Sequence, residues 1–349
     1  MGSSLSSSIP NYSTKIQTKD GKTFTIFYHD LVDHLLLLRK VIAHPEMTQQ
    51  GETLNYFIKD YCKRMAQQEM KTKAQQLKLP WQIEWIWHVH RLHPLAYQND
   101  CLKQLNGQLV DKTVRKLFYK KKDPVVVFTS TKDSSFVPSI DLAKAVLRQR
   151  DFLDKFQRHQ LFAFDLRKLN RTTFQNLVQN YISFLKLATK NEMIVPTFDI
   201  DIMWHTHLRY PSRYQEVCIA LCGFLLDHDD SIESGTLTNA YQQTADRWKK
   251  AYRSEYGQDV DRNHLQASRY LSSCAMVFMP VFIGGGGYSS CGAIGGDGNC
   301  GDVACGGGGG GDACSSCGSG GGGGDSGGGC GSSCGGGCGG GCGGGCGGG

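Results

Sequence analysis

Two short stretches of the chain carry the same set of side chains that can do chemistry, an indole followed by two imidazoles. The first is Trp-His-Val-His at residues 87–90, and the second is Trp-His-Thr-His at residues 204–207. Six positions coincide at one constant spacing of 117 residues, and they are Trp87/Trp204, His88/His205, His90/His207, Pro94/Pro211, Tyr97/Tyr214 and Cys101/Cys218. Repetition of such rare residue types predicts two related modules.

An acidic residue precedes each motif at a spacing that favours contact with the first histidine. Glu84 lies four residues before His88, and Asp201 lies four residues before His205. Residues four apart share one face of a helix, so each carboxylate can bond to its imidazole or share a metal ion with it. If the two motifs meet across a pseudo-twofold axis, the combined set suits zinc or a di-metal centre. The candidate metal ligands are Glu84, His88, His90, Asp201, His205 and His207.

Three interpretations of these residues remain open. In the first, the motif is structural, because the indoles anchor the core and the imidazoles bond to backbone carbonyls. In the second it binds a metal or another ligand, and in the third it performs acid–base catalysis. His-x-His alone is a weak metal signature. Two histidines two residues apart point about 200° apart on a helix, so they hold one ion only if the helix ends between them. The structural interpretation is preferred.

The prolines indicate how helices position the motif. Proline lacks an amide hydrogen and suits the first turn of a helix, so Pro94 and Pro211 predict a helix, a sharp turn and a second helix. The tyrosine and cysteine that follow are four residues apart and share a face, which we expect to be buried. The structural anchors of the two copies are Trp87, Pro94, Tyr97, Cys101, Trp204, Pro211, Tyr214 and Cys218.

The pattern of apolar residues predicts a mainly α-helical fold. Helical spacing runs through residues 30–44 and 52–79 before the first motif, and through 141–156 and 172–189 before the second. Asp20-Gly21 between two alternating runs predicts a β-hairpin near the start. We therefore expect two tandem related helical modules, a small N-terminal β-hairpin and a disordered Gly/Cys-rich tail. The expected domains are a flexible N-terminus at 1–14, a first helical module at 15–124, a second at 125–283 and the tail at 284–349.

Composition separates the tail from the body. Of the 44 glycines 37 follow Ile283, as do 10 of the 15 cysteines, whereas every lysine and arginine precedes it. A segment that is more than half glycine cannot bury enough apolar surface to offset the entropy of ordering, so disorder is expected there. Five cysteines recur every fourth residue from Cys330 to Cys346. Such thiols can collect soft metals, oxidise or accept palmitate.

The charge pattern and the apolar runs limit which partners and which cellular location are expected. The positive charges of the body are spread among acids, so nucleic-acid binding is not expected. The sequence has no secretory signal and no run near the roughly 20 apolar residues of a membrane-spanning helix, which favours a cytoplasmic protein. Gly2 with Ser6 fits the N-myristoylation pattern. Stable membrane attachment would need a second signal, which the tail cysteines could supply.

Several segments together resemble one known family. They are the two Trp-His-x-His motifs, the stretches 141–149 and 226–230, the spacing from Thr244 to Trp248, and the glycine-rich end. In these the chain resembles the glycine-rich domain-containing proteins, best known from plants, over most of residues 27–270. That family has no established enzymatic activity in its repeated region, and its plant members are linked with development, stress responses and hormone signalling. The resemblance transfers no catalytic residue, and the chain lacks the aromatic RNA-recognition sequence that some members carry.

Three functions follow as expectations. The preferred one is a non-catalytic interaction or regulatory protein, a signalling or stress-response scaffold with protein partners. The first alternative is a metal-dependent enzyme that uses the paired Glu, Asp and His residues, with zinc as its candidate cofactor. The second alternative is a thiol-rich metal or redox buffer that works through the tail.

Overall fold

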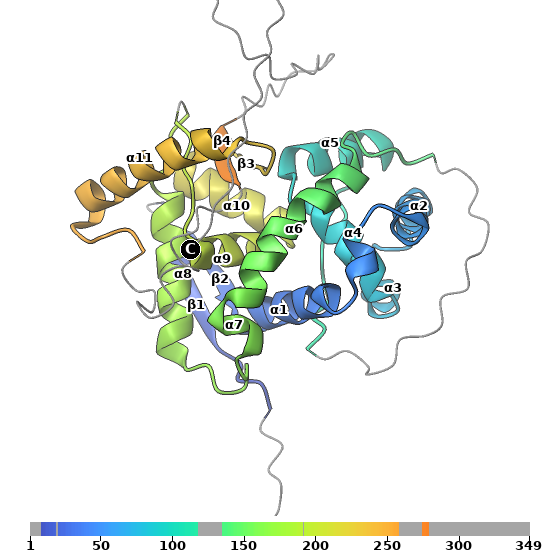
Figure 1. Ribbon diagram of the computed structural model, residues 1–349, viewed down its shortest axis with the longest axis horizontal. Helices are drawn as coiled ribbons and strands as arrows, with labels where there is room; N and C mark the ends of the chain where they lie inside the picture. The colour runs from blue at the N-terminus through green and yellow to red at the C-terminus, as the bar shows by residue number, and fades with distance from the viewer. Residues whose placement is uncertain (1–7, 19, 118–134, 191, 258–273, 279–349) are drawn as a thin grey trace, which may run out of the picture. The chain divides into compact units, whose positions relative to one another are not determined.

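The computed structural model describes residues 8–18, 20–117, 135–190, 192–257 and 274–278. Within them the predicted mainly α-helical fold with a small N-terminal β-hairpin is confirmed (Figure 1). The chain divides into two compact units, Met1–Gly284 and Gly285–Gly349, and the described residues all belong to the first. Residues 1–7, the expected module boundary after residue 124 and the tail expected to be disordered at 284–349 lie outside the described residues.

The hairpin pairs β1 (Ser13–Gln17) with β2 (Thr23–Phe27) in antiparallel register, with Ser13 opposite Phe27. Gly21 adopts φ = 80° in the turn, a conformation that costs glycine little because it has no Cβ. Ile16 and Ile26 are buried, and the next residue after β2 begins the first helix. The hairpin therefore attaches to the helical core through these two side chains and the start of that helix.

The first copy of the motif is surrounded by helices from residues 28 to 104. Amphipathic spacing places one face of each helix in the core, and proline begins the last of them, as its missing amide allows. The elements are α1 (Tyr28–Ile42), the 3-10 helix η1 (Pro45–Met47), α2 (Glu52–Ala66), α3 (Lys73–Leu77), α4 (Trp81–Arg91) and α5 (Pro94–Gln104).

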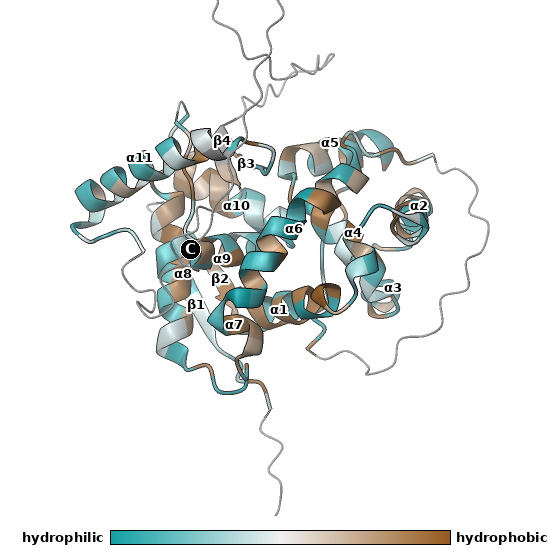
Figure 2. Cartoon of the chain, in the orientation of Figure 1, coloured by the Kyte–Doolittle hydropathy of each residue, from teal (hydrophilic) through white to brown (hydrophobic). Residues whose placement is uncertain are grey.

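The second copy has a similar series of elements. Asp141, Asn170 and Thr197 cap three of its helices, each by accepting a hydrogen bond from a backbone amide in the first turn. Hydrophilic and hydrophobic residues alternate along the first of them (Figure 2), as expected of a helix with one buried face. The elements are α6 (Leu142–Arg158), α7 (Gln160–Ala163), α8 (Arg171–Leu185), α9 (Phe198–Leu208), α10 (Pro211–Cys222) and α11 (Ser234–Tyr252).

A second pair of strands follows the second copy. β3 (Leu226–Asp229) pairs with β4 (Ala275–Phe278) in antiparallel register, with His228 opposite Met276. The amino-acid sequence does not predict this pair, because four-residue strands carry too short a pattern and the partners are distant in sequence. The pair brings the end of the described chain back to the second motif.

The first helices of the two copies pack across the boundary between the copies. α1 packs against both α4 and α9, the helices that carry the two motifs, and α6 packs against α4 (Figure 1). His34 on α1 bonds through Nδ1 to the Thr206 hydroxyl on α9, at 2.8 Å. One continuous hydrophobic cluster includes residues of both copies, among them the fully buried Trp87 and Trp204. The copies therefore fold as one interlocked core.

Candidate functional site

The tryptophan and tyrosine of each motif form the same hydrogen-bonded corner. In the first copy Trp87 Nε1 donates to the Tyr97 hydroxyl at 2.9 Å, and that hydroxyl donates to the Val110 carbonyl at 2.5 Å. In the second copy Trp204 Nε1 donates to Tyr214 at 3.1 Å, and Tyr214 donates to the Leu226 carbonyl at 2.9 Å. Pro94 and Pro211 begin the helices that carry these tyrosines. The corner fixes the motif helix, the next helix and the following segment together.

The second histidine of each motif has a tyrosine partner from an earlier helix. Tyr61 on α2 lies 2.8 Å from His90 Nδ1, and Tyr181 on α8 lies 2.9 Å from His207 Nδ1. Asp100 lies 3.0 Å from His90 Nε2. Burial lowers the pKa of His90 despite Asp100, and it lowers the pKa of His207 to about 3. Both histidines are therefore neutral at pH 7 and hold helices together.

The motif cysteines are buried packing residues. Cys101 and Cys218 are both fully buried, and neither forms a disulfide. Burial raises the pKa of Cys101 to about 11 and raises the pKa of Cys218 still further. The thiol form therefore predominates at neutral pH, whereas nucleophilic catalysis requires the thiolate.

Glu84 pairs with cations and not with His88. Its carboxylate lies 3.4 Å from Lys112 Nζ, 2.6 Å from Lys116 Nζ and 3.6 Å from Arg209 Nη2. Burial alone would raise the pKa of Glu84, but the three cations lower it to about 2. Lys112 also lies 3.2 Å from Asp33, so Glu84 is part of a buried network of charges.

His88 lies among aromatic rings at the centre of the core. Its ring centroid is 4.8 Å from that of His34 and 6.2 Å from that of His205. Neither ring nitrogen of His88 has a hydrogen-bond partner among the described residues. Burial, together with His34 and Arg209, holds the pKa of His88 well below 6.5, so the ring is neutral.

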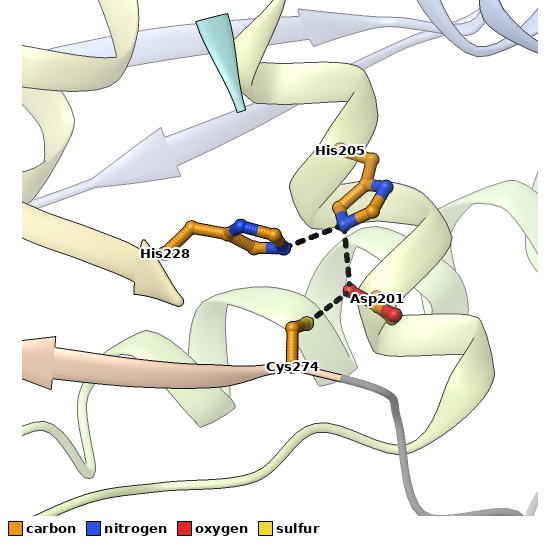
Figure 3. A group of neighbouring side chains, drawn as sticks. All are labelled: Asp201, His205, His228 and Cys274. Carbon is orange, nitrogen blue, oxygen red and sulfur yellow. Dashed lines mark hydrogen bonds and ion pairs between the residues drawn. The ribbon is translucent and has the colours of Figure 1, made fainter. Parts of the chain in front are cut away.

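A group of four ligand-type side chains gathers in the second copy, and we call it the Asp201 cluster. Each side chain offers one atom, and these atoms lie within 4.8 Å of one another. His205 Nε2 is 2.9 Å from His228 Nε2 and 3.1 Å from Asp201 Oδ1, and the Cys274 thiol donates to the same carboxylate at 3.3 Å (Figure 3). All four residues are at least 98% buried. The cluster consists of Asp201, His205, His228 and Cys274.

The elements explain how these residues meet. Asp201 and His205 are four apart on α9 and share one face. His228 on β3 is opposite Met276 on β4, and Cys274 lies two residues from Met276. Side chains alternate along a strand, so Cys274 and His228 project to the same face of the pair. That face is directed toward α9 (Figure 3).

The first copy has a lysine where the second has the cluster histidine. A Gly-x-Leu-x-Asp sequence occupies 107–111 and recurs at 223–227, so the residues that follow, Lys112 and His228, correspond. The tyrosine contacts to Val110 and Leu226 fix the same alignment. Glu84 corresponds to Asp201 in the motif helices. The carboxylate therefore faces an ammonium group in the first copy and an imidazole in the second.

The structure thus separates the six candidate ligands. Asp201 and His205 meet in the Asp201 cluster, whereas Glu84, His88, His90 and His207 lie at other places in the core. His228 and Cys274 were missed as ligands by the sequence analysis. The alignment of His228 with Lys112 was a signal that could have identified the former, but no spacing indicated Cys274.

One cavity among the described residues lies away from the motif histidines. It has a volume of about 400 Å³ and lies among α7, α8, the start of α9 and the end of α11. Its lining includes Asn170, Thr173, Asp199 and Trp248, and none of the motif histidines. A substrate in this cavity would not reach the motif imidazoles.

Comparison with known proteins finds a sequence similarity over part of the chain. A family model described as glycine-rich domain-containing protein-like matches residues 109–216, which include α6, α8, α9 and the second motif. The chain resembles the glycine-rich domain-containing proteins. No solved structure matches the chain.

Two curated relatives from Arabidopsis thaliana carry this family name. Glycine-rich domain-containing protein 1 is 27% identical over 205 residues, which are 51% of this chain and 25% of the relative. Glycine-rich domain-containing protein 2 is 27% identical over 214 residues, which are 51% of this chain and 26% of the relative. The aligned region thus spans about a quarter of the length of these glycine-rich domain-containing proteins.

The expectations about membranes fall mostly on residues outside the described ranges. No described helix combines the length and the hydropathy that crossing a bilayer requires. The lipidation candidate Gly2 and the tail cysteines lie outside the described residues.

Proposed function

We propose that this chain is a non-catalytic interaction protein with a regulatory role, a scaffold in signalling or in a stress response. The observation that carries the proposal is that the indole and the second histidine of each motif copy are hydrogen-bonded within the core. The indoles bond to tyrosines, and His90 and His207 are bonded to Tyr61 and Tyr181. A residue used in this way sets the shape of the protein and leaves its outer surface for partners.

The burial of the motif supports the non-catalytic assignment. A general base must reach a proton on the substrate, directly or through one water molecule. His90 and His207 are enclosed in the core, and neither lines the cavity of about 400 Å³. The motif cysteines have raised pKa values, which disfavours a thiolate nucleophile. We propose protein partners, and peripheral membrane association through Gly2 and the tail cysteines as an additional property.

The second candidate is a metal-dependent enzyme, which the Asp201 cluster favours because it contains metal-ligand side chains. A catalytic zinc site keeps one position open for water or substrate. The four side chains of the cluster are buried, which argues for a closed site. The third candidate, a thiol-rich metal or redox buffer, depends on tail cysteines that lie outside the described residues.

Binding and turnover measured on the same full-length protein test the proposal. We expect affinity capture from the native tissue, with quantitative mass spectrometry, to retain a defined protein that binds the purified chain at fixed stoichiometry. A Trp204→Ala chain, whose core anchor is lost, is the matched control and should not retain it. Metal-dependent turnover of a small-molecule substrate that His205→Gln abolishes in a folded protein would overturn the proposal in favour of an enzyme.

A further inference from the structure

We propose that the Asp201 cluster binds one zinc ion as a closed, structural site. The donor types are those that zinc prefers, since the cluster offers a thiol, two imidazole nitrogens and a carboxylate. Ligand atoms bound to a tetrahedral zinc at about 2.0–2.3 Å lie roughly 3.3–3.8 Å apart. Three separations between neighbouring ligand atoms of the cluster, 2.9, 3.1 and 3.3 Å, are near this range, and all four ligand atoms lie within 4.8 Å of one another. Rotation of the side chains would bring the four atoms onto one ion.

The contact between the two histidines supports a cation between them. His205 Nε2 and His228 Nε2 face each other at 2.9 Å, and only one proton fits between two such nitrogens. The other ring nitrogen of each histidine, Nδ1, has no hydrogen-bond partner among the described residues. A proton on each Nδ1 leaves both Nε2 lone pairs directed into the cluster. A divalent cation accepts both lone pairs at once.

The first copy of the motif provides an internal comparison. There Lys112 places its ammonium group beside the Glu84 carboxylate, at 3.4 Å. In the second copy the corresponding carboxylate is Asp201, and His228 replaces the lysine. An imidazole cannot extend a cation toward the carboxylate as lysine does, but it can hold one. Zinc in the Asp201 cluster would thus take the place that an ammonium group occupies in the first copy.

The number and the burial of the ligands indicate the role of the ion. Four protein ligands complete a tetrahedral zinc, and structural sites have this closed form. Cys274 is 2% exposed and stands immediately before β4, so the ion would fasten β4 to α9. The role goes beyond the proposed scaffold function, because the site stabilises the fold whether or not a partner binds. Loss of zinc and loss of partner binding are separate results.

Metal analysis of the full-length protein, purified without chelators, tests the site. The tail cysteines are common to all variants, so the difference between variants reports on the cluster. We expect Cys274→Ser and His228→Ala to contain one zinc ion per chain less than the wild type. Cys62→Ser and His44→Ala are the matched controls and should keep the wild-type content. His88→Leu should keep it too, although His88 corresponds to His205. Equal zinc in the wild type and in Cys274→Ser, or iron or copper in its place, would overturn the proposal.

Site-resolved alkylation gives a second measurement that the tail cannot obscure. Peptide mass spectrometry should find Cys274 protected from iodoacetamide in the zinc-loaded protein and labelled after chelation. Labelling of Cys222, which is partly exposed and outside the cluster, should not change. If Cys274 reacts at the same rate with and without chelator, the site does not bind zinc.

A lysine at position 228 would convert the second copy to the arrangement of the first. We expect His228→Lys to fold without zinc, because its ammonium group can approach Asp201. Chelation should lower the melting temperature of the wild type and leave that of His228→Lys unchanged. A wild-type melting temperature that is insensitive to chelation would contradict the structural role. If His228→Lys does not fold, the difference in zinc content between the wild type and Cys274→Ser still tests whether the cluster binds zinc.

Discussion

Gln98 Nε2 donates a hydrogen bond to Gln215 Oε1 at 3.2 Å, although the two residues are 117 positions apart. This spacing is the one that relates the two motifs, so each glutamine contacts its own counterpart. Contacts between corresponding residues occur where a twofold axis passes. The rings of His88 and His205, also counterparts, are 6.2 Å apart. These two pairs of counterparts therefore indicate a pseudo-twofold axis between the copies.

The tyrosine corners should contribute equally in the two copies. Tyr97→Phe removes the acceptor of Trp87 and the donor to Val110, and Tyr214→Phe does the same to Trp204 and Leu226. Buried groups that lose their partners are costly, so we expect each change to lower the free energy of unfolding by about 2–3 kcal/mol. Urea denaturation followed by tryptophan fluorescence measures both. Values that differ by more than a factor of two would show that the corners are not equivalent.

Removing Lys112 should destabilise the core strongly. Its ammonium group lies 3.2 Å from Asp33 and 3.4 Å from Glu84, and its side chain is 1% exposed. Loss of one partner from a buried network leaves charge that water cannot reach, so Lys112→Met should cost about 3–5 kcal/mol. Lys22→Met, which removes the exposed pair with Asp20, is the control and should show no measurable change. A Lys112→Met protein as stable as wild type would mean that the network is not formed.

His88 should be replaceable by an apolar residue. Both of its ring nitrogens lack partners among the described residues, and the ring is fully buried. A polar group in that condition opposes folding, so His88→Leu should raise the free energy of unfolding at pH 7 by about 1–2 kcal/mol. Chemical denaturation measures the difference. Destabilisation by His88→Leu would indicate that the imidazole has a partner, such as an enclosed water molecule.

Stability should fall in two stages as the pH is lowered. Burial holds the pKa values of His34 and His88 well below 6.5, so below pH 6.5 the unfolded chain binds protons that the folded chain does not. Each such histidine then removes about 1.4 kcal/mol per pH unit, until its folded pKa is reached. Glu84 has a folded pKa of about 2, against an ordinary value of 4.5, so its contribution is lost as the pH falls from 4.5 toward 2.

Urea midpoints measured between pH 7.5 and pH 5 test the first stage. His88→Leu should have a smaller pH slope than the wild type, because one of the buried histidines is gone. His44→Ala, which changes a partly exposed histidine, is the control and should keep the wild-type slope. Parallel slopes for wild type and His88→Leu would show that His88 already titrates normally in the folded protein.

The sequence predicted the elements better than the contacts. Proline positions and helical spacing located the helix that begins at Pro94 and the one that begins at Pro211, because these signals are local. The spacing of Glu84 and His88 also placed them on one face, yet Glu84 contacts lysines. A nearby ammonium group attracts a buried carboxylate more strongly than a neutral imidazole does, and the approach of residues 112–116 is a tertiary feature.

The Asp201 cluster also depends on tertiary contacts that local sequence patterns do not predict. Asp201 and His205 were paired by their spacing on a helix, whereas His228 and Cys274 join them from strands that are distant in sequence. Cys274 has no cysteine or histidine close to it in the sequence that would mark it as a metal ligand. The pairing of β3 with β4 directs Cys274 toward α9, and the residues next to Cys274 in the sequence do not predict that pairing.

Because α1 and α6 pack across the two copies, a truncated protein would lose part of its core. A protein shortened after the first half would keep α4 but lose α6, which covers it, and α1 would lose the surface of α9. The apolar faces of α4 and α1 that become exposed would promote aggregation and proteolysis. The smallest part of this chain that can fold independently is therefore the two copies together, and neither half would fold as a separate domain.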